Sequence, residues 1–83
     1  MRAKIRDLLL LVALLATLPA LAEEGAADAR RHMVRGLAAI EMAKSAADLA
    51  PAAEEFRRAT ELDPTLSAAW YNLGSVQVKL GQF

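Results

Sequence analysis

The stretch DPTLSAAWYNLG, residues 63–74, decides the fold because it joins the end of one helix to the start of another. The residue before Pro64 is pushed out of the helical region, which ends a preceding helix. Beyond the proline, Trp70 and Leu73 are spaced to share one face of a helix, and Gly74 follows directly. A glycine weakens a helix interior by about 1 kcal/mol relative to alanine, so packing is expected to explain it.

Apolar residues at spacings of three and four predict three helices, and the expected ranges are 29–46, 49–62 and 66–80. Asp48 is expected to cap the second helix, and Thr65 or Ser67 the third. Pro51 falls in the first turn of the second helix, where its missing amide would be unpaired anyway. Gly81 is a typical residue for ending the third helix. No strand pattern is present, so the predicted fold class is all-α.

Residues 1–22 carry the pattern of a secretory signal peptide. Three basic residues precede the run 8–18, in which a threonine is the one polar residue. Ala20 and Ala22 supply the small side chains that signal peptidase accepts, so cleavage is expected between Ala22 and Glu23. No twin-arginine pair precedes the apolar run, which favours the general secretory route to the periplasm or the extracellular space.

Two other interpretations of the apolar run stay open. An uncleaved membrane anchor is disfavoured because 8–22 offers fifteen residues with Pro19 inside, whereas a spanning helix needs ~20 apolar residues. A buried core helix would show a polar face, and 8–18 has none. Residues 23–28 are acidic and contain a glycine, which predicts a flexible leader before the helical region 29–83.

The helical region carries the pattern A-x3-F-x2-A, then a proline, then W-x2-L-G, at Ala52, Phe56, Ala59, Pro64, Trp70, Leu73 and Gly74. This order and spacing resemble the tetratricopeptide repeat (TPR), a 34-residue helix–turn–helix unit. The resemblance covers the second helix of one repeat and the first helix of the next. It implies antiparallel helix–turn–helix repeats that stack as an α-solenoid.

The resemblance also implies a packing role for each signature residue. Trp70 and Leu73 would pack between the helices of their own repeat and the preceding one. Gly74 would admit a neighbouring helix backbone, and Phe56 would fill the core within its repeat. Gly36, in the first predicted helix, is likewise expected to mark a close backbone contact.

The chain departs from the family pattern in places. Gln77 stands where the family usually has an aromatic residue, and the first helix has Gly36 and Ile40 where the repeat would have its tryptophan and glycine. The first helix is therefore expected to be a degenerate, capping one. Phe83 falls where the family often places an aromatic residue, in the turn between the two helices of a repeat. We expect either a longer protein truncated within its second repeat or a third helix covered by another chain.

The resemblance implies a non-catalytic protein–protein interaction module that serves as an exported scaffold or adaptor. The groove-facing candidates on the third helix are Tyr71, Asn72, Ser75 and Lys79, with Leu37, Glu41 and Lys44 as their equivalents on the first. Asn72 would hold an extended peptide backbone, and Lys79 would meet a carboxylate. A self-association module working through the third helix, and a regulatory fragment of a larger envelope protein or enzyme, are the alternatives.

Composition argues against other function classes. One histidine and no cysteine leave no zinc, haem or iron–sulfur ligand set, so no metal or cofactor is expected. His32 is interpreted as an exposed polar side chain, and the adjacent Glu54 and Glu55 as a solvated helix surface. The seven basic and nine acidic residues of 23–83 are too balanced to favour nucleic acid or a membrane surface. Membrane contact is expected only through the signal peptide before cleavage, and no enzyme activity is expected.

The signal-peptide interpretation predicts the terminus of the exported protein. The mass of the product that accumulates after export is expected to match a chain beginning at Glu23. A product that retains Met1 would contradict cleavage and would favour the uncleaved anchor.

Overall fold

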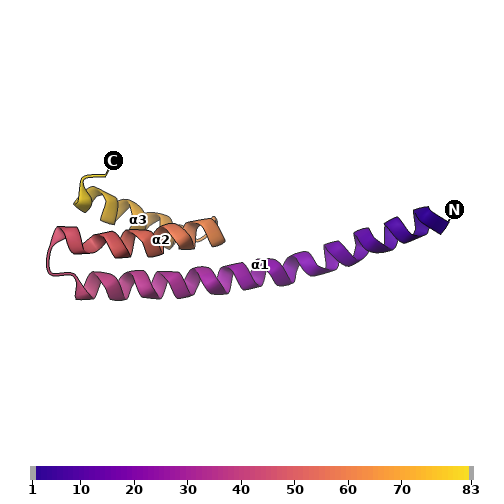
Figure 1. Ribbon diagram of the computed structural model, residues 1–83, viewed down its shortest axis with the longest axis horizontal. Helices are drawn as coiled ribbons and strands as arrows, with labels where there is room; N and C mark the ends of the chain where they lie inside the picture. The colour runs from indigo at the N-terminus through magenta and orange to yellow at the C-terminus, as the bar shows by residue number, and fades with distance from the viewer. Residues whose placement is uncertain (1, 83) are drawn as a thin grey trace.

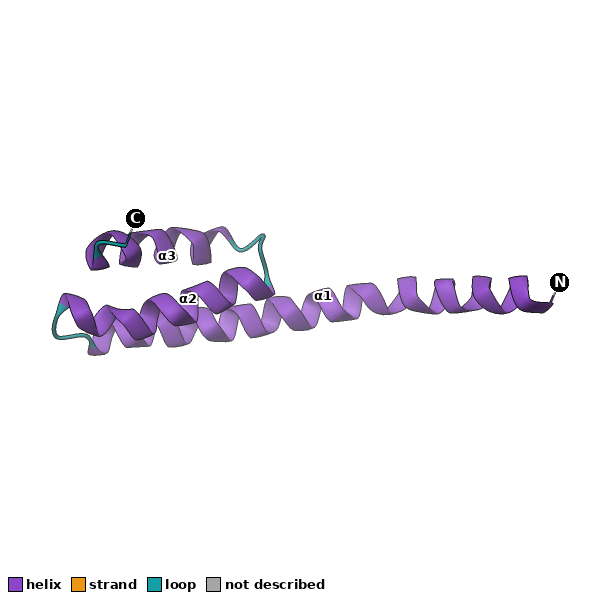
Figure 2. Ribbon diagram, turned by 45° about the horizontal axis from the view of Figure 1, so that its top comes forward, coloured by secondary structure: helices purple, strands orange, loops and turns teal. Residues whose placement is uncertain are grey.

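The computed structural model describes the backbone of residues 2–82 and the side chains of residues 19–82. The described chain is helical and has no strand, as predicted. Its elements are the α-helix α1 (Arg2–Met42), the short 3-10 helix η1 (Ala46–Leu49), and the α-helices α2 (Ala50–Leu62) and α3 (Ser67–Leu80). Each α-helix runs antiparallel to the next, and α2 lies beside both α1 and α3 (Figure 1, Figure 2).

Helix α1 differs from the expected first helix at both ends. Residues 23–28 were expected to be a flexible leader and are helical instead. Part of the reason is packing, because a Cβ on Gly25 would lie 3.0 Å from the carbonyl oxygen of Leu62 at the end of α2. At the other end, α1 stops at Met42 rather than Ala46, since the chain turns there and enters η1.

The part of α1 before Gly25 extends beyond the other two helices (Figure 1). Residues 19–24 are all exposed, and they include the predicted cleavage residues Ala20, Ala22 and Glu23. The side chains of the predicted basic start and apolar run lie outside the described residues. Among the described residues, no helix combines the length and the apolar character that crossing a bilayer requires.

The start of α2 agrees with the sequence prediction in one respect and not in another. Pro51 lies in the first turn, as predicted, but Leu49 is the N-cap residue and no side chain caps the helix. Asp48 lies inside η1, so it cannot stand at the cap position. Its carboxylate instead accepts a hydrogen bond from the backbone amide of Lys44 at 3.0 Å, which closes the turn after α1.

The turn between α2 and α3 is held by Asp63 rather than by a helix cap. One oxygen of its carboxylate accepts hydrogen bonds from the Thr65 amide at 3.1 Å and the Thr65 hydroxyl at 2.6 Å. The Thr65 hydroxyl is therefore turned back toward α2, and Ser67 is already the first residue of α3. Leu66 occupies the N-cap position without a side-chain hydrogen bond, so the predicted cap at Thr65 or Ser67 is wrong.

Helix α3 ends at Gly81, as predicted. The φ of Gly81 is +72°, in the left-handed region that favours glycine. The amide of Gln82 donates to the carbonyl of Gln77 at 2.8 Å, and the amide of Gly81 donates to the carbonyl of Val78 at 3.1 Å. These two bonds form a Schellman motif, which satisfies carbonyl groups that the helix end would leave free.

The core lies along α2 and receives side chains from both neighbours. The main cluster of buried residues is Leu49, Ala52, Phe56, Leu73 and Val76. Met33 and Ile40 of α1 pack against it. A second cluster takes one fully buried alanine from each α-helix, namely Ala29, Ala59 and Ala69. Small side chains at these three positions let the helices approach closely.

Gly36 creates the space that the ring of Phe56 occupies. A Cβ at Gly36 would lie 2.5 Å from Cε1 of Phe56, well inside van der Waals contact. The close contact predicted at Gly36 therefore exists, although its neighbour is a phenyl ring rather than a helix backbone. Gly74 is different, since no described atom outside its own helix backbone and adjoining residues lies within 4 Å of the position that a Cβ would take there. The close backbone contact predicted at Gly74 is therefore not seen among the described residues.

These two glycines give opposite predictions for the same substitution. Gly36→Ala is expected to lower the free energy of unfolding by about 1–3 kcal/mol, because the Phe56 ring must move from its site. Gly74→Ala is expected to raise it by about 0.5–1 kcal/mol, because helix propensity improves and the added methyl meets nothing. Urea denaturation followed by circular dichroism measures both. If the two substitutions changed the free energy of unfolding equally, this result would contradict the packing of the Phe56 ring against Gly36.

Candidate protein-interaction surfaces

The predicted repeat signature divides into a buried and an exposed group. The buried members are Ala52, Phe56, Ala59 and Leu73. Three of these lie on α2, where they face the two neighbouring helices. The proline and the tryptophan of the signature, Pro64 and Trp70, are exposed. The packing expected of the signature is therefore present along α2 and only partly present along α3.

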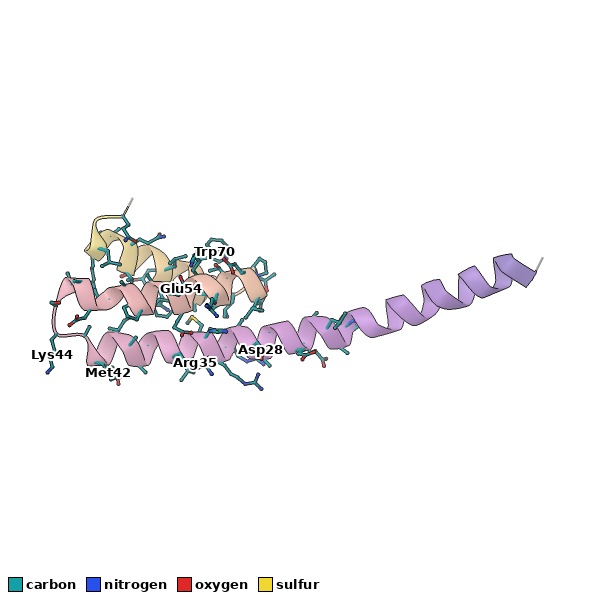
Figure 3. All side chains as sticks on the ribbon, in the orientation of Figure 1. Asp28, Arg35, Met42, Lys44, Glu54 and Trp70 are labelled. Carbon is teal, nitrogen blue, oxygen red and sulfur yellow. The ribbon has the colours of Figure 1, made fainter. Side chains whose placement is uncertain are left out.

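Trp70 does not pack in the groove between helices, contrary to the prediction. Its side chain is 52% exposed on the outside of α3 (Figure 3). The indole N–H donates a hydrogen bond to the carbonyl oxygen of Pro64 at 2.8 Å. This bond ties the indole to the turn that precedes α3. Leu73, for which the same packing was predicted, is buried because it lies on the side of α3 that faces α2.

The outer face of α3 is a shallow exposed surface lined by Trp70, Tyr71, Gly74, Ser75, Val78 and Lys79. Tyr71 and Val78 are 77% and 64% exposed, so the surface is largely apolar. It lies opposite the buried row of α3, as the 3.6-residue period requires. Its one charged side chain is that of Lys79.

Three of the four predicted groove residues, Tyr71, Ser75 and Lys79, belong to the outer face of α3. Asn72 does not line it. The Asn72 side-chain amide donates to the carbonyl oxygen of Ala68 at 2.8 Å, within the same helix. One of its two amide hydrogens is therefore already used, and Asn72 is less free to hold a peptide backbone than predicted.

A second surface forms where the end of α1, η1 and α3 meet. This lysine hollow is lined by Ile40, Ala43, Lys44, Ser45, Ala46, Leu49 and Lys79. Leu49 is buried, while Ile40 is half-buried, so its floor is apolar. Lys44 and Lys79 bring two positive charges to it. The hollow therefore suits a ligand in which an anionic group lies next to an apolar group.

The predicted candidates on the first helix are only partly brought to this site. Lys44 lies in the turn after α1 (Figure 3) and lines the lysine hollow. Leu37 and Glu41 are exposed on α1 but do not line it. Sequence spacing alone treats all three as one helical row, whereas the helix ends at Met42 and Lys44 lies in the turn beyond it.

His32 and Glu55 form a contact that sequence reasoning missed. Nδ1 of His32 lies 2.6 Å from Oε2 of Glu55, and the two side chains are 17% and 28% exposed. The contact joins α1 to α2, so the interpretation of His32 as an exposed side chain is wrong. It depends on how the two helices are aligned, and no local sequence signal indicates it.

Glu54, next to Glu55, belongs to the solvent-facing surface of α2. Hydrogen bonds from Arg57 and then Arg58 hold the pKa of Glu54 below its usual value. The same contact with Glu54 raises the pKa of Arg57. The Glu54 carboxylate is thus kept ionised, and this small stabilisation is lost as the pH falls through its lowered pKa. Among residues 19–82, no three histidine, aspartate or glutamate side chains gather as a metal site.

Comparison with known proteins gives no relative from which a function can be taken. No family model, no curated protein and no solved structure matches the chain. The function is therefore argued from the fold and from the two surfaces above.

The His32–Glu55 contact predicts a measurable coupling between α1 and α2. A double-mutant cycle with His32→Ala and Glu55→Ala is expected to give a coupling free energy of about 0.5–1.5 kcal/mol, as for a partly buried hydrogen bond. The exposed pair of Arg31 and Asp28 within α1 serves as the control. Unfolding in urea at neutral pH measures both cycles. A coupling for His32 and Glu55 no larger than the control would contradict the contact.

Proposed function

We propose that the chain is a non-catalytic protein–protein interaction module of the TPR type, which acts as an exported scaffold or adaptor in the periplasm or cell envelope. The observation that carries the proposal is the position of α2 between α1 and α3. Its signature residues Ala52, Phe56 and Ala59 are fully buried against these neighbours. The burial of these three residues supports the proposal, and the opposite sides of the helices leave exposed surface for a partner.

The partner is proposed to bind at the lysine hollow through an acidic peptide segment. Lys44 and Lys79 offer ammonium groups that attract carboxylates without demanding one geometry. The floor around Leu49 offers apolar contact to a neighbouring side chain of the peptide. Since both ammonium groups lie at the surface, we expect modest affinity that falls as salt is added.

Cleavage between Ala22 and Glu23 is compatible with the way α1 packs. Residues 19–24 are exposed, and packing against α2 begins at Gly25. Removal of 1–22 would therefore take away none of the packing described for the helical hairpins. The shortened helix would begin with Glu23 and Glu24, and acidic residues in a first turn are favourable with the helix dipole.

Charge reversal in the lysine hollow tests the proposed site. The probe is a fluorescent hexapeptide of five glutamates and one leucine with a free carboxyl end. Lys44→Glu alone, and Lys44→Glu with Lys79→Glu, are expected to weaken its binding, the double change by at least tenfold. Fluorescence anisotropy at low salt gives the dissociation constants.

The matched control is Arg30→Glu with Arg35→Glu, which makes the same charge change on the exposed side of α1. This control is expected to keep more affinity than the lysine double variant. Equal losses for the two double variants would show general charge attraction and would contradict a site at the hollow. A probe in which the glutamates are replaced by glutamines is expected not to bind.

A further inference from the structure

We propose that the outer face of α3 pairs with the same face of a second copy of this chain, through a two-fold axis that passes between Gly74 and Ser75. The two α3 helices would run antiparallel across each other. This pairing uses a different surface from the lysine hollow, and the two surfaces share one residue, Lys79. The second copy would cover the outer face of α3, which is largely apolar and is not covered by any described residue.

The six residues of the outer face are complementary to themselves under this symmetry. A two-fold axis between positions 74 and 75 sets each residue of the face opposite another residue of the face. Trp70 comes opposite Lys79, Tyr71 opposite Val78, and Gly74 opposite Ser75 of the second copy. Every residue of the set therefore faces a residue of the same set, which is compatible with an isologous interface.

The smallest residues of the face stand where the helices would cross. Gly74 has open space beside it, in which a Cβ would meet no neighbouring helix. Ser75 adds only a hydroxymethyl group. Two helices that meet at such residues can approach to the short end of the usual 8–10 Å between axes. The neighbours one turn away, Tyr71 and Val78, then come into contact across the interface.

The charge on the face also fits a second copy. Lys79 is its single charged residue, and the pairing directs that ammonium toward an indole, whose π face attracts cations. The Pro64 hydrogen bond already restricts the Trp70 ring, which reduces the entropy lost on binding. The two Lys79 residues would be nine helix positions apart, or about 14 Å, beyond the ~8 Å over which salt screens charges.

The available area indicates a weak dimer. With exposures of 52% and 77%, Trp70 and Tyr71 together offer ~300 Å², since a large aromatic side chain presents at most ~250 Å². The other four residues raise the area to ~450 Å² on each copy, or at most ~900 Å² in total, which is below the ~1,200 Å² of stable interfaces and in the range of weak, transient ones. The dissociation constant is therefore expected in the micromolar range or weaker.

Disulfide cross-linking tests the geometry, because the chain contains no cysteine. The 83-residue sequence is expressed, and the protein that accumulates in the cells is purified for the experiment. In the proposed pair, the two Ser75 residues lie one helix position apart, and the two Ser67 residues lie fifteen positions, or about 22 Å, apart. Ser75→Cys is expected to cross-link under mild oxidation at least tenfold faster than the matched control Ser67→Cys. Equal rates would overturn the proposed axis.

A charge at the crossing point tests the interface itself. Gly74→Glu is expected to leave the helical content unchanged, because a Cβ at this position meets no described neighbour. It is expected to keep the protein monomeric by facing two carboxylates toward each other. Ala38→Glu adds the same charge on the exposed side of α1 and is expected to retain dimerisation. Sedimentation equilibrium across micromolar to millimolar concentrations measures the mass. A wild-type protein that stays monomeric at all concentrations, or dimerisation that survives Gly74→Glu, would overturn the proposal.

The dimerisation experiment and the peptide-binding experiment can fail independently of each other. Gly74 and Ser75 do not line the lysine hollow, and Lys44 does not line the outer face of α3. Loss of dimerisation in Gly74→Glu with peptide binding retained would support the pairing alone. Loss of peptide binding in Lys44→Glu with dimerisation retained would support the peptide site alone.

Discussion

The arrangement of the three α-helices depends on the contact between the Phe56 ring and the bare backbone of Gly36. The ring comes from α2, is fully buried, and shares its cluster with Leu73 and Val76 of α3. Any side chain at Gly36 would hold α1 away from α2 and would displace the ring from that cluster. One contact therefore sets both the spacing of α1 against α2 and the centre against which α3 packs. The pairing of His32 with Glu55 follows from the same alignment.

Local chemistry made the helix boundaries predictable only where it acts on the backbone directly. Pro51 and Gly81 restrict or permit particular φ angles at their own positions, so the start of α2 and the end of α3 lie where the sequence indicates. The predictions for Asp48 and Thr65 failed because a cap depends on the path of the chain before the helix. At Asp48 that path is η1, and at Thr65 it is a turn closed by the carboxylate of Asp63.

The surfaces were harder to predict than the helices, because they depend on which side of a helix has a neighbour. Gly36 and Gly74 are both helix glycines, and sequence reasoning assigns both the same packing role. In the structure one contacts a phenyl ring and the other faces open space. Trp70 was expected to be covered for the same reason and is half exposed. Lys44 lines the same hollow as Lys79 from the turn that follows the end of α1 at Met42.

Lys79 lies at the boundary between the two proposed binding events and makes them interdependent. It lines both the lysine hollow and the outer face of α3. An ammonium group held by a peptide carboxylate is less available to the indole of a second copy. By linkage, any weakening of the dimer by the peptide equals the weakening of peptide binding by the dimer. The exposed end of one side chain would then allow the module either to pair with itself or to hold a partner.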